Sequence, residues 1–131
     1  MNKYAKLGVL FALGGCTYVG LEKLWRGRSH GSMFLAGGTC FVLIGQLNHA
    51  HPRLPVPLRA LVGALIVTMV EFAAGLLVNR DFGVWDYRDQ PGNLMGQICP
   101  LFSALWIPLS LLAIYLYSAM EARMEEKLSP V

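Results

Sequence analysis

The sequence predicts an all-α, polytopic membrane protein with four transmembrane helices. Of its 131 residues, 55% are hydrophobic and 15% are charged, whereas soluble domains average roughly 45–50% apolar and 25% charged residues. The apolar residues gather into four runs, at positions 7–21, 32–47, 60–78 and 99–117. Charged or proline-rich segments separate these runs. We therefore expect one integral membrane domain, residues 1–131, with spans at about 5–24, 32–50, 58–78 and 96–118.

The run at 60–78 is the clearest of the four spans. At about 1.5 Å per residue, its length matches the roughly 30 Å hydrocarbon core of a bilayer. A soluble helix would have a polar face, and this run has none. One acid interrupts it, Glu71, within about one turn of the midplane. Because an ionisable group at this depth is costly, Glu71 is the first candidate for a functional residue.

The remaining spans are bounded by loops of different character. The first two runs are shorter, and Trp25 and His49 at their ends can extend them into the interface. The loop at 22–31 is basic, and the loop at 49–57 carries three prolines that stop a helix. Lysine and arginine are divided almost evenly between the two sides, so the sequence predicts four spans without an orientation.

An internal similarity suggests that the four helices form two pseudo-repeated helix hairpins. The pentapeptides at 43–47 and 94–98 both contain a Gly-Gln pair. Each glutamine follows an acid by a similar distance, Gln46 after Glu22 and Gln97 after Glu71. Both hairpins would begin on the same side, as in a parallel repeat around the membrane normal. Chance similarity between two leucine- and glycine-rich helices is the alternative.

The spacing of polar residues predicts a cluster around Glu71. Glu71, Gly75 and Asn79 share one helix face at i, i+4 and i+8, and a small residue on that face allows close helix approach. Asn93 and Gln97 are also four residues apart, and would share a face if the last helix began before Cys99. We expect Gln97 and Gln46 to face the same interior volume as Glu71. Such a cluster either binds a cation, a proton or a polar substrate, or only fixes the helix packing.

Two further groups of residues are candidates for the same substrate or ion pathway. Glu22 stands at the edge of the first run, and either pairs with Arg26 at the interface or contributes to a shared cavity. Trp85, Asp86 and Tyr87 lie between the third and fourth runs. The favoured interpretation of this tripeptide is an aromatic anchor at the headgroup level. The alternative is a re-entrant lid over the polar cavity.

Several functional classes are disfavoured. A net charge of +3 with scattered basic residues does not indicate nucleic-acid binding. The three cysteines lie inside apolar runs and the three histidines lack metal-ligand spacing, so we expect no disulfide framework, no metal and no cofactor. The sequence contains no Walker A loop, nucleophile elbow, dinucleotide fingerprint or zincin motif. We therefore expect that this chain is not itself an ATPase.

The combined motifs are similar to a known family. Residues 22–33, Gly37-Gly38 and Ile44-Gly45 resemble the first half of the small bacterial membrane proteins known as CmpB-like, type IV ABC-transporter permeases. The second half is matched by Glu71-Phe72, Gly75, Asn79, 84–87, Pro91, Asn93, 96–99 and Trp106. The likeness covers about residues 18–110, and departs from the family at Arg88, where the family carries serine. The resemblance implies a multi-pass protein of the bacterial cell membrane.

These observations favour a permease-like membrane protein whose substrate the sequence does not identify. The alternatives are a membrane-embedded enzyme that uses Glu71, Glu22 or Asp86 as acid or base, and a non-catalytic scaffold. Besides the lipid bilayer, we expect a protein partner, because an ATP-driven role would require a separate ATPase subunit. Small-residue patches at 14–15, 37–38 and 73–75 could serve a homodimer or the packing within one bundle equally well.

Overall fold

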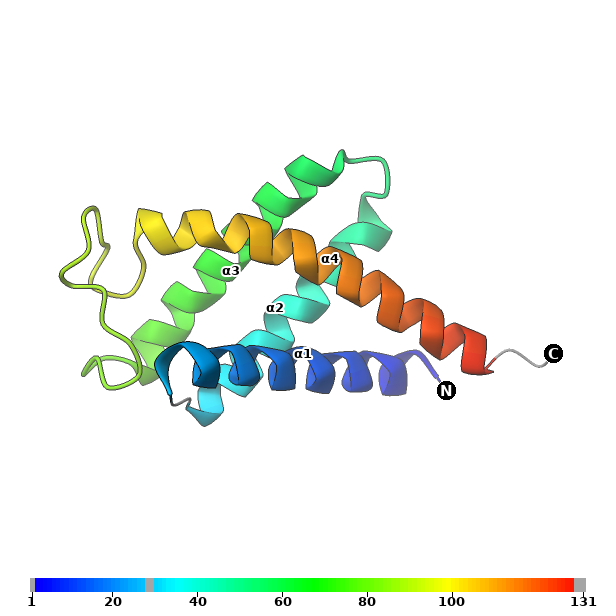
Figure 1. Cartoon of the computed structure of the whole chain (residues 1–131), viewed down its shortest axis with the longest axis horizontal. Helices are drawn as coiled ribbons and strands as arrows, with labels where there is room; N and C mark the ends of the chain where they lie inside the picture. Colours follow the sequence, from blue (N-terminus) through cyan, green and yellow to red (C-terminus); the bar gives the residue numbers. More distant parts are fainter. Residues whose placement is uncertain (1, 28–29, 129–131) are drawn as a thin grey trace.

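Four helices make up most of the chain. The computed structural model describes residues 2–27 and 30–128, apart from the side chains of 25–26 and 126–128. The helices are α1 (Lys3–Arg26), α2 (Gly31–Ala50), α3 (Val56–Val78) and α4 (Pro100–Leu128) (Figure 1). Each of them is long and apolar enough to cross a membrane. The prediction of an all-α fold with four spanning helices is confirmed.

The helix boundaries follow from local chemistry. α1 begins after Asn2, whose side-chain oxygen accepts a hydrogen bond from the backbone amide of Ala5 at 2.8 Å. It ends at Gly27, whose φ of 77° is the left-handed conformation that glycine adopts without a steric penalty. α3 begins at Val56, with Pro57 in its first turn, where a missing backbone N–H leaves no hydrogen bond unmade.

Glycines allow α1 and α2 to pack closely as a hairpin. A Cβ atom on Gly14 would collide with the ring of Phe41, and one on Gly37 would collide with Tyr18. Gly15 and Gly38 are equally close to side chains of the facing helix. The small-residue patches at 14–15 and 37–38 are therefore used within this chain.

The second pair, α3 and α4, packs beside the first, and α2 contacts both of its helices. Figure 1 shows both ends of the described chain and the α2–α3 connection at one end of the bundle, with the segment 79–99 at the other. At the first end Glu121 of α4 joins two other helices, because its carboxylate lies 2.9 Å from Lys6 Nζ and 2.9 Å from His49 Nε2. From this end α1 and α4 diverge (Figure 1).

The structure differs from the sequence-based expectation where α4 begins. This helix begins at Pro100 rather than near residue 96, and the preceding residues form turns. Gly96 has a φ of 69°, which is incompatible with a right-handed helix, and Pro100 disfavours a helical conformation at Cys99. Of the two similar pentapeptides, the one at 43–47 is helical and the one at 94–98 is not. The two pentapeptides are therefore similar in sequence but differ in backbone conformation.

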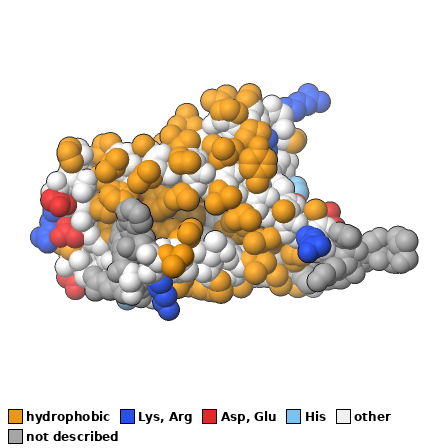
Figure 2. Space-filling view, in the orientation of Figure 1, with side chains coloured by type: hydrophobic (Ala, Val, Ile, Leu, Met, Phe, Trp, Pro, Cys, Tyr) orange, Lys and Arg blue, Asp and Glu red, His pale blue; other side chains and the backbone are white. Residues whose placement is uncertain are grey.

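The surface agrees with a bilayer environment. Hydrophobic side chains cover the middle of the molecule in Figure 2, and charged side chains lie mainly toward its ends. Many large apolar side chains are exposed on α3 and α4, among them Leu65, Met69, Leu77 and Leu112. Exposed apolar area on this scale is unfavourable in water and expected against lipid.

Candidate functional site

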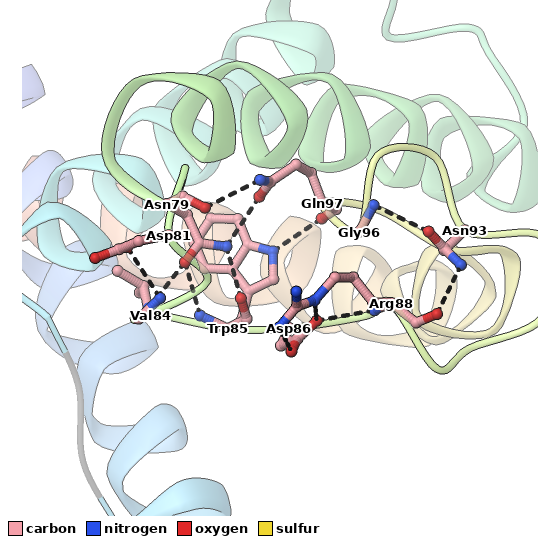
Figure 3. A network of polar contacts seen from close by, with 10 residues as sticks. Asn79, Asp81, Val84, Trp85, Asp86, Arg88, Asn93, Gly96 and Gln97 are labelled. Carbon is pink, nitrogen blue, oxygen red and sulfur yellow. Dashed lines mark hydrogen bonds and ion pairs between the residues drawn. The ribbon is translucent and has the colours of Figure 1, made fainter.

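The side chain of Asn79 organises the segment that connects α3 to α4. Asn79 caps the C-terminal end of α3 and is fully buried. Its Oδ1 accepts hydrogen bonds from the backbone amides of Val84 and Trp85, at 2.8 and 3.1 Å (Figure 3). Its Nδ2 donates to Trp85 O at 2.7 Å and to Gln97 Oε1 at 2.9 Å. Both polar atoms of the amide are thus used to bend the chain back toward the bundle.

Gln97 completes this arrangement from the far end of the segment. Its Nε2 donates to the backbone carbonyl of Asn79 at 3.0 Å, and its own carbonyl accepts from Trp85 Nε1 at 2.9 Å (Figure 3). Its side chain packs onto Gly75, where a Cβ atom would collide with the amide. The predicted face of Glu71, Gly75 and Asn79 is confirmed as a buried face.

The two aromatic residues of the segment point inward. Trp85 and Tyr87 are only 5% and 4% exposed, so the interpretation of this tripeptide as an aromatic anchor in the headgroup layer is wrong. The Tyr87 ring stacks on Phe102 of α4, with centroids 4.7 Å apart and planes 8° from parallel. The segment instead folds back onto the bundle, and backbone hydrogen bonds such as Tyr87 N to Gly96 O at 3.0 Å and Leu94 N to Ile98 O at 2.9 Å hold its turns. The re-entrant lid remains a prediction.

Glu71 lies where α3, α4 and this segment meet. Its Oε2 accepts a hydrogen bond from Tyr87 Oη at 3.0 Å, and its Oε1 accepts one from Trp106 Nε1 at 3.4 Å. The residue is 9% exposed. Burial of a carboxyl group is unfavourable unless donors surround it, and here the donors come from two other parts of the chain.

Beside Glu71 lies a cavity of about 490 Å³, lined mainly by α1, α2 and α4. Tyr87 and Trp106, which donate hydrogen bonds to Glu71, both line this cavity. Glu22 of α1 lines it as well. Tyr18 also lines it and packs against Trp106, with ring centroids 6.1 Å apart. Figure 2 shows the hollow, surrounded by hydrophobic side chains. The alternative in which Glu22 contributes to a cavity is therefore supported by the geometry.

Two of the predicted residues lie apart from this site. Gln46 donates to Tyr117 Oη at 3.3 Å, and the expectation that it faces the same volume as Glu71 is wrong. Asn93 stabilises a turn instead of a helix face. Its Nδ2 donates to the carbonyl of Gln90 at 2.9 Å, and its Oδ1 accepts from the amide of Gly96 at 2.9 Å.

Asp86 points outward and is paired with Arg88. Arg88 donates to both carboxylate oxygens, Nε to Oδ1 at 2.9 Å and Nη2 to Oδ2 at 2.8 Å. The guanidinium also lies 4.0 Å from the centroid of the Phe82 ring. These hydrogen bonds hold the pKa of Asp86 below its usual range. An exposed, ion-paired carboxylate does not contribute to the buried site, so the geometry does not support Asp86 as its acid or base.

Two further predictions concern Arg26 and metal ligands. The side chain of Arg26, considered as a partner of Glu22, lies outside the described residues. Within residues 2–27 and 30–128, no three histidine, cysteine, aspartate or glutamate side chains form a group that could hold a metal ion.

Sequence reasoning missed the aromatic walls of the cavity. Tyr18, Phe102 and Trp106 all lie within apolar runs, so hydropathy does not distinguish them from residues that only fill a membrane span. One signal was present, because Tyr18 precedes Glu22 by one helical turn and so shares its face.

Comparison with known proteins identifies one family. A family model described as "Putative ABC-transporter type IV" matches residues 8–130, which include nearly all of the four helices and the whole site. Searches of curated proteins and of solved structures find no match to this chain.

Proposed function

Since the chain belongs to the putative ABC-transporter type IV family, we propose that it is a permease-like membrane subunit that binds its substrate in the cavity beside Glu71. The observation that carries this proposal is the position of that cavity. It lies between helices that diverge, and it shares Tyr87 and Trp106 with the buried carboxylate. A volume of about 490 Å³ falls within the range of small-molecule sites, roughly 300–1,000 Å³.

The alternative role of Glu71 as structural glue explains less of this arrangement. Hydrogen bonds from Tyr87 and Trp106 would fix the packing of α3 and α4 without any space beside them. Packing alone gives no role to the cavity that Tyr87 and Trp106 also line. The polar cluster is therefore proposed as the wall of a substrate pathway, with Glu71, Glu22, Tyr87 and Trp106 as its polar groups.

A separate ATPase subunit is the partner that we propose. The chain contains no nucleotide-binding motif, so ATP-driven transport requires a second protein. A homodimer is the alternative, but two of the small-residue patches that favoured it pack inside the chain. We place this assembly in a bacterial cell membrane.

The assembly is tested by gentle extraction of the tagged chain from its native membranes. The expected particle contains an ATPase subunit in fixed ratio and hydrolyses ATP. Glu71→Gln should leave the particle assembled, because the amide is isosteric, and should lower ATP-driven transport at least tenfold because the buried charge is lost. Asp89→Asn is the matched control, since it removes one negative charge from the exposed connecting segment. A fully active particle with one polypeptide of 14.4 kDa would refute the proposal.

A further inference from the structure

We propose that the cavity takes an amphiphilic cation, a quaternary ammonium or protonated amine carried on a single apolar chain, which enters from the bilayer. This inference rests on the proposed function and names the substrate class of the same site. Three features of the cavity carry it: its aromatic walls, the carboxylates beside it and its apolar opening between α1 and α4.

The aromatic walls form a partial cage. The rings form two pairs: Tyr18 packs against Trp106 at a tilt of 31°, with centroids 6.1 Å apart, and Tyr87 stacks on Phe102 at 4.7 Å. All four rings line the cavity, and they come from α1, α4 and the connecting segment. The faces of aromatic rings attract cations, most strongly where water is excluded, and sites for quaternary ammonium groups are built in this way.

The carboxylates give the cage a negative field. Glu22 lines the cavity, and Glu71 is hydrogen-bonded to two of its walls. Tyr18 precedes Glu22 by one helical turn on the same face of α1, and it also lines the cavity. Among the described residues that line the cavity there is no lysine, arginine or histidine. In a site of low dielectric constant this charge distribution favours a cation and disfavours an anion.

The opening of the cavity is apolar. From the aromatic cage it continues along leucines that are exposed on the outer faces of α1 and α4: Leu21, Leu105, Leu109 and Leu112. In a bilayer these faces contact acyl chains, so a ligand with an apolar tail can enter laterally. Within this apolar part, the hydroxyl of Ser110 lines the cavity, is 2% exposed and has no hydrogen-bond partner. An unpaired buried hydroxyl is unfavourable, and a bound ligand can relieve it.

Direct binding to the isolated chain tests the inference. The chain is placed in phosphatidylcholine nanodiscs and titrated with radiolabelled decyltrimethylammonium, and binding to empty discs is subtracted. Decyl sulfate and 1-decanol, which carry the same apolar chain, are the competitors. We expect saturable binding of the cation, and competition by the anion and the alcohol at least tenfold weaker than by unlabelled cation. This arm needs no variant, so it remains decisive if a substitution prevents folding.

Two substitutions assign the recognition to named residues. Glu22→Gln should lower the affinity for decyltrimethylammonium about tenfold because a charge beside the cage is removed. Phe102→Leu keeps the site apolar but removes one aromatic ring. It should lower the affinity for decyltrimethylammonium by a similar factor. Asp89→Asn, outside the cavity, should leave the affinity unchanged.

The outcomes separate this inference from the proposed transport function. Equal or tighter binding of decyl sulfate would overturn it. Three other results would also overturn the inference. These are binding of 1-decanol as tight as that of the cation, no saturable binding of the cation, and an unchanged affinity for the cation in Glu22→Gln. Cation binding by a chain that assembles with no ATPase would keep the inference and refute the transporter. An active ATPase complex whose membrane chain binds no cation would support the proposed transport function and refute the cation-binding inference.

Discussion

The hydroxyl of Tyr87 lies 3.0 Å from Glu71 Oε2 and donates a hydrogen bond to it, which joins the 79–99 segment to the middle of the bundle. Tyr87 also lines the cavity and stacks on Phe102. The position of the connecting segment is therefore coupled to the surroundings of the buried acid and to the shape of the cavity. A displacement of this segment would change both at once.

The first prediction concerns the removal of this hydroxyl. Tyr87→Phe keeps the ring stacked on Phe102 and removes the hydrogen bond to Glu71. We expect the free energy of unfolding to fall by about 2 kcal/mol, because hydrogen bonds to charged or buried partners contribute about 1.5–3 kcal/mol. The measurement is unfolding by SDS titration in mixed micelles. Tyr115→Phe, on an exposed tyrosine of α4, is the control and should change nothing. Equal effects of both variants would show that the Tyr87–Glu71 bond does not stabilise the fold.

The second prediction concerns the contact between α3 and the connecting segment. Gly75→Ala places a methyl group against the side chain of Gln97, which cannot move without losing its hydrogen bonds to Asn79. We expect a loss of about 3 kcal/mol in the free energy of unfolding, from overpacking and broken hydrogen bonds.

The control for this variant is Gly20→Ala. Gly20 lies within α1 and a Cβ atom there would meet no neighbour, so this substitution should be neutral or stabilise the protein by roughly 0.5–1 kcal/mol through helix propensity. Proteolysis should report the same difference, with faster cleavage between residues 79 and 99 in Gly75→Ala alone. If Gly75→Ala were as stable as Gly20→Ala, the packing of Gln97 on Gly75 would not hold the segment in place.

The helices could be predicted from sequence because the bilayer constrains them strongly. A spanning segment must be long, apolar and internally hydrogen-bonded, and runs such as 60–78 show all of this in the sequence. The buried face of Glu71, Gly75 and Asn79 follows from helical spacing alone. These predictions depend only on short-range periodicity.

The connecting segment could not be predicted in this way. Its fold depends on side-chain hydrogen bonds across long separations, such as that between Asn79 and Gln97. It also depends on left-handed conformations at Phe82 and Met95, with φ of 58° and 56°, which these residue types rarely adopt. Gln46 shows the opposite error, because a repeated pentapeptide suggested an equivalence that the helix boundary at Pro100 removes.

The third prediction concerns the unpaired hydroxyl of Ser110. Because this buried group has no hydrogen-bond partner, Ser110→Ala should raise the free energy of unfolding of the ligand-free chain by about 1 kcal/mol. Ser103→Ala is the matched control in the same helix. The hydroxyl of Ser103 lies 3.0 Å from that of Thr68, so its removal should lower stability by about 0.5–1.5 kcal/mol. Loss of stability in both variants would contradict the expected difference.

The last prediction concerns topology. The structure places both ends of the described chain and the α2–α3 connection at one end of the bundle, and the 79–99 segment at the other (Figure 1). Four spans then require both termini on one side of the membrane. Single cysteines at positions 29, 53, 88 and 129, in a background without Cys16, Cys40 and Cys99, should label in two groups with a membrane-impermeant maleimide. Positions 29 and 88 should react from one side, and positions 53 and 129 from the other. Because each helix reverses the direction of the chain across the bilayer, a helix that does not span would move every later position to the opposite side. A different partition would show that α2, α3 or α4 does not span, whereas failure of α1 would move all four positions together.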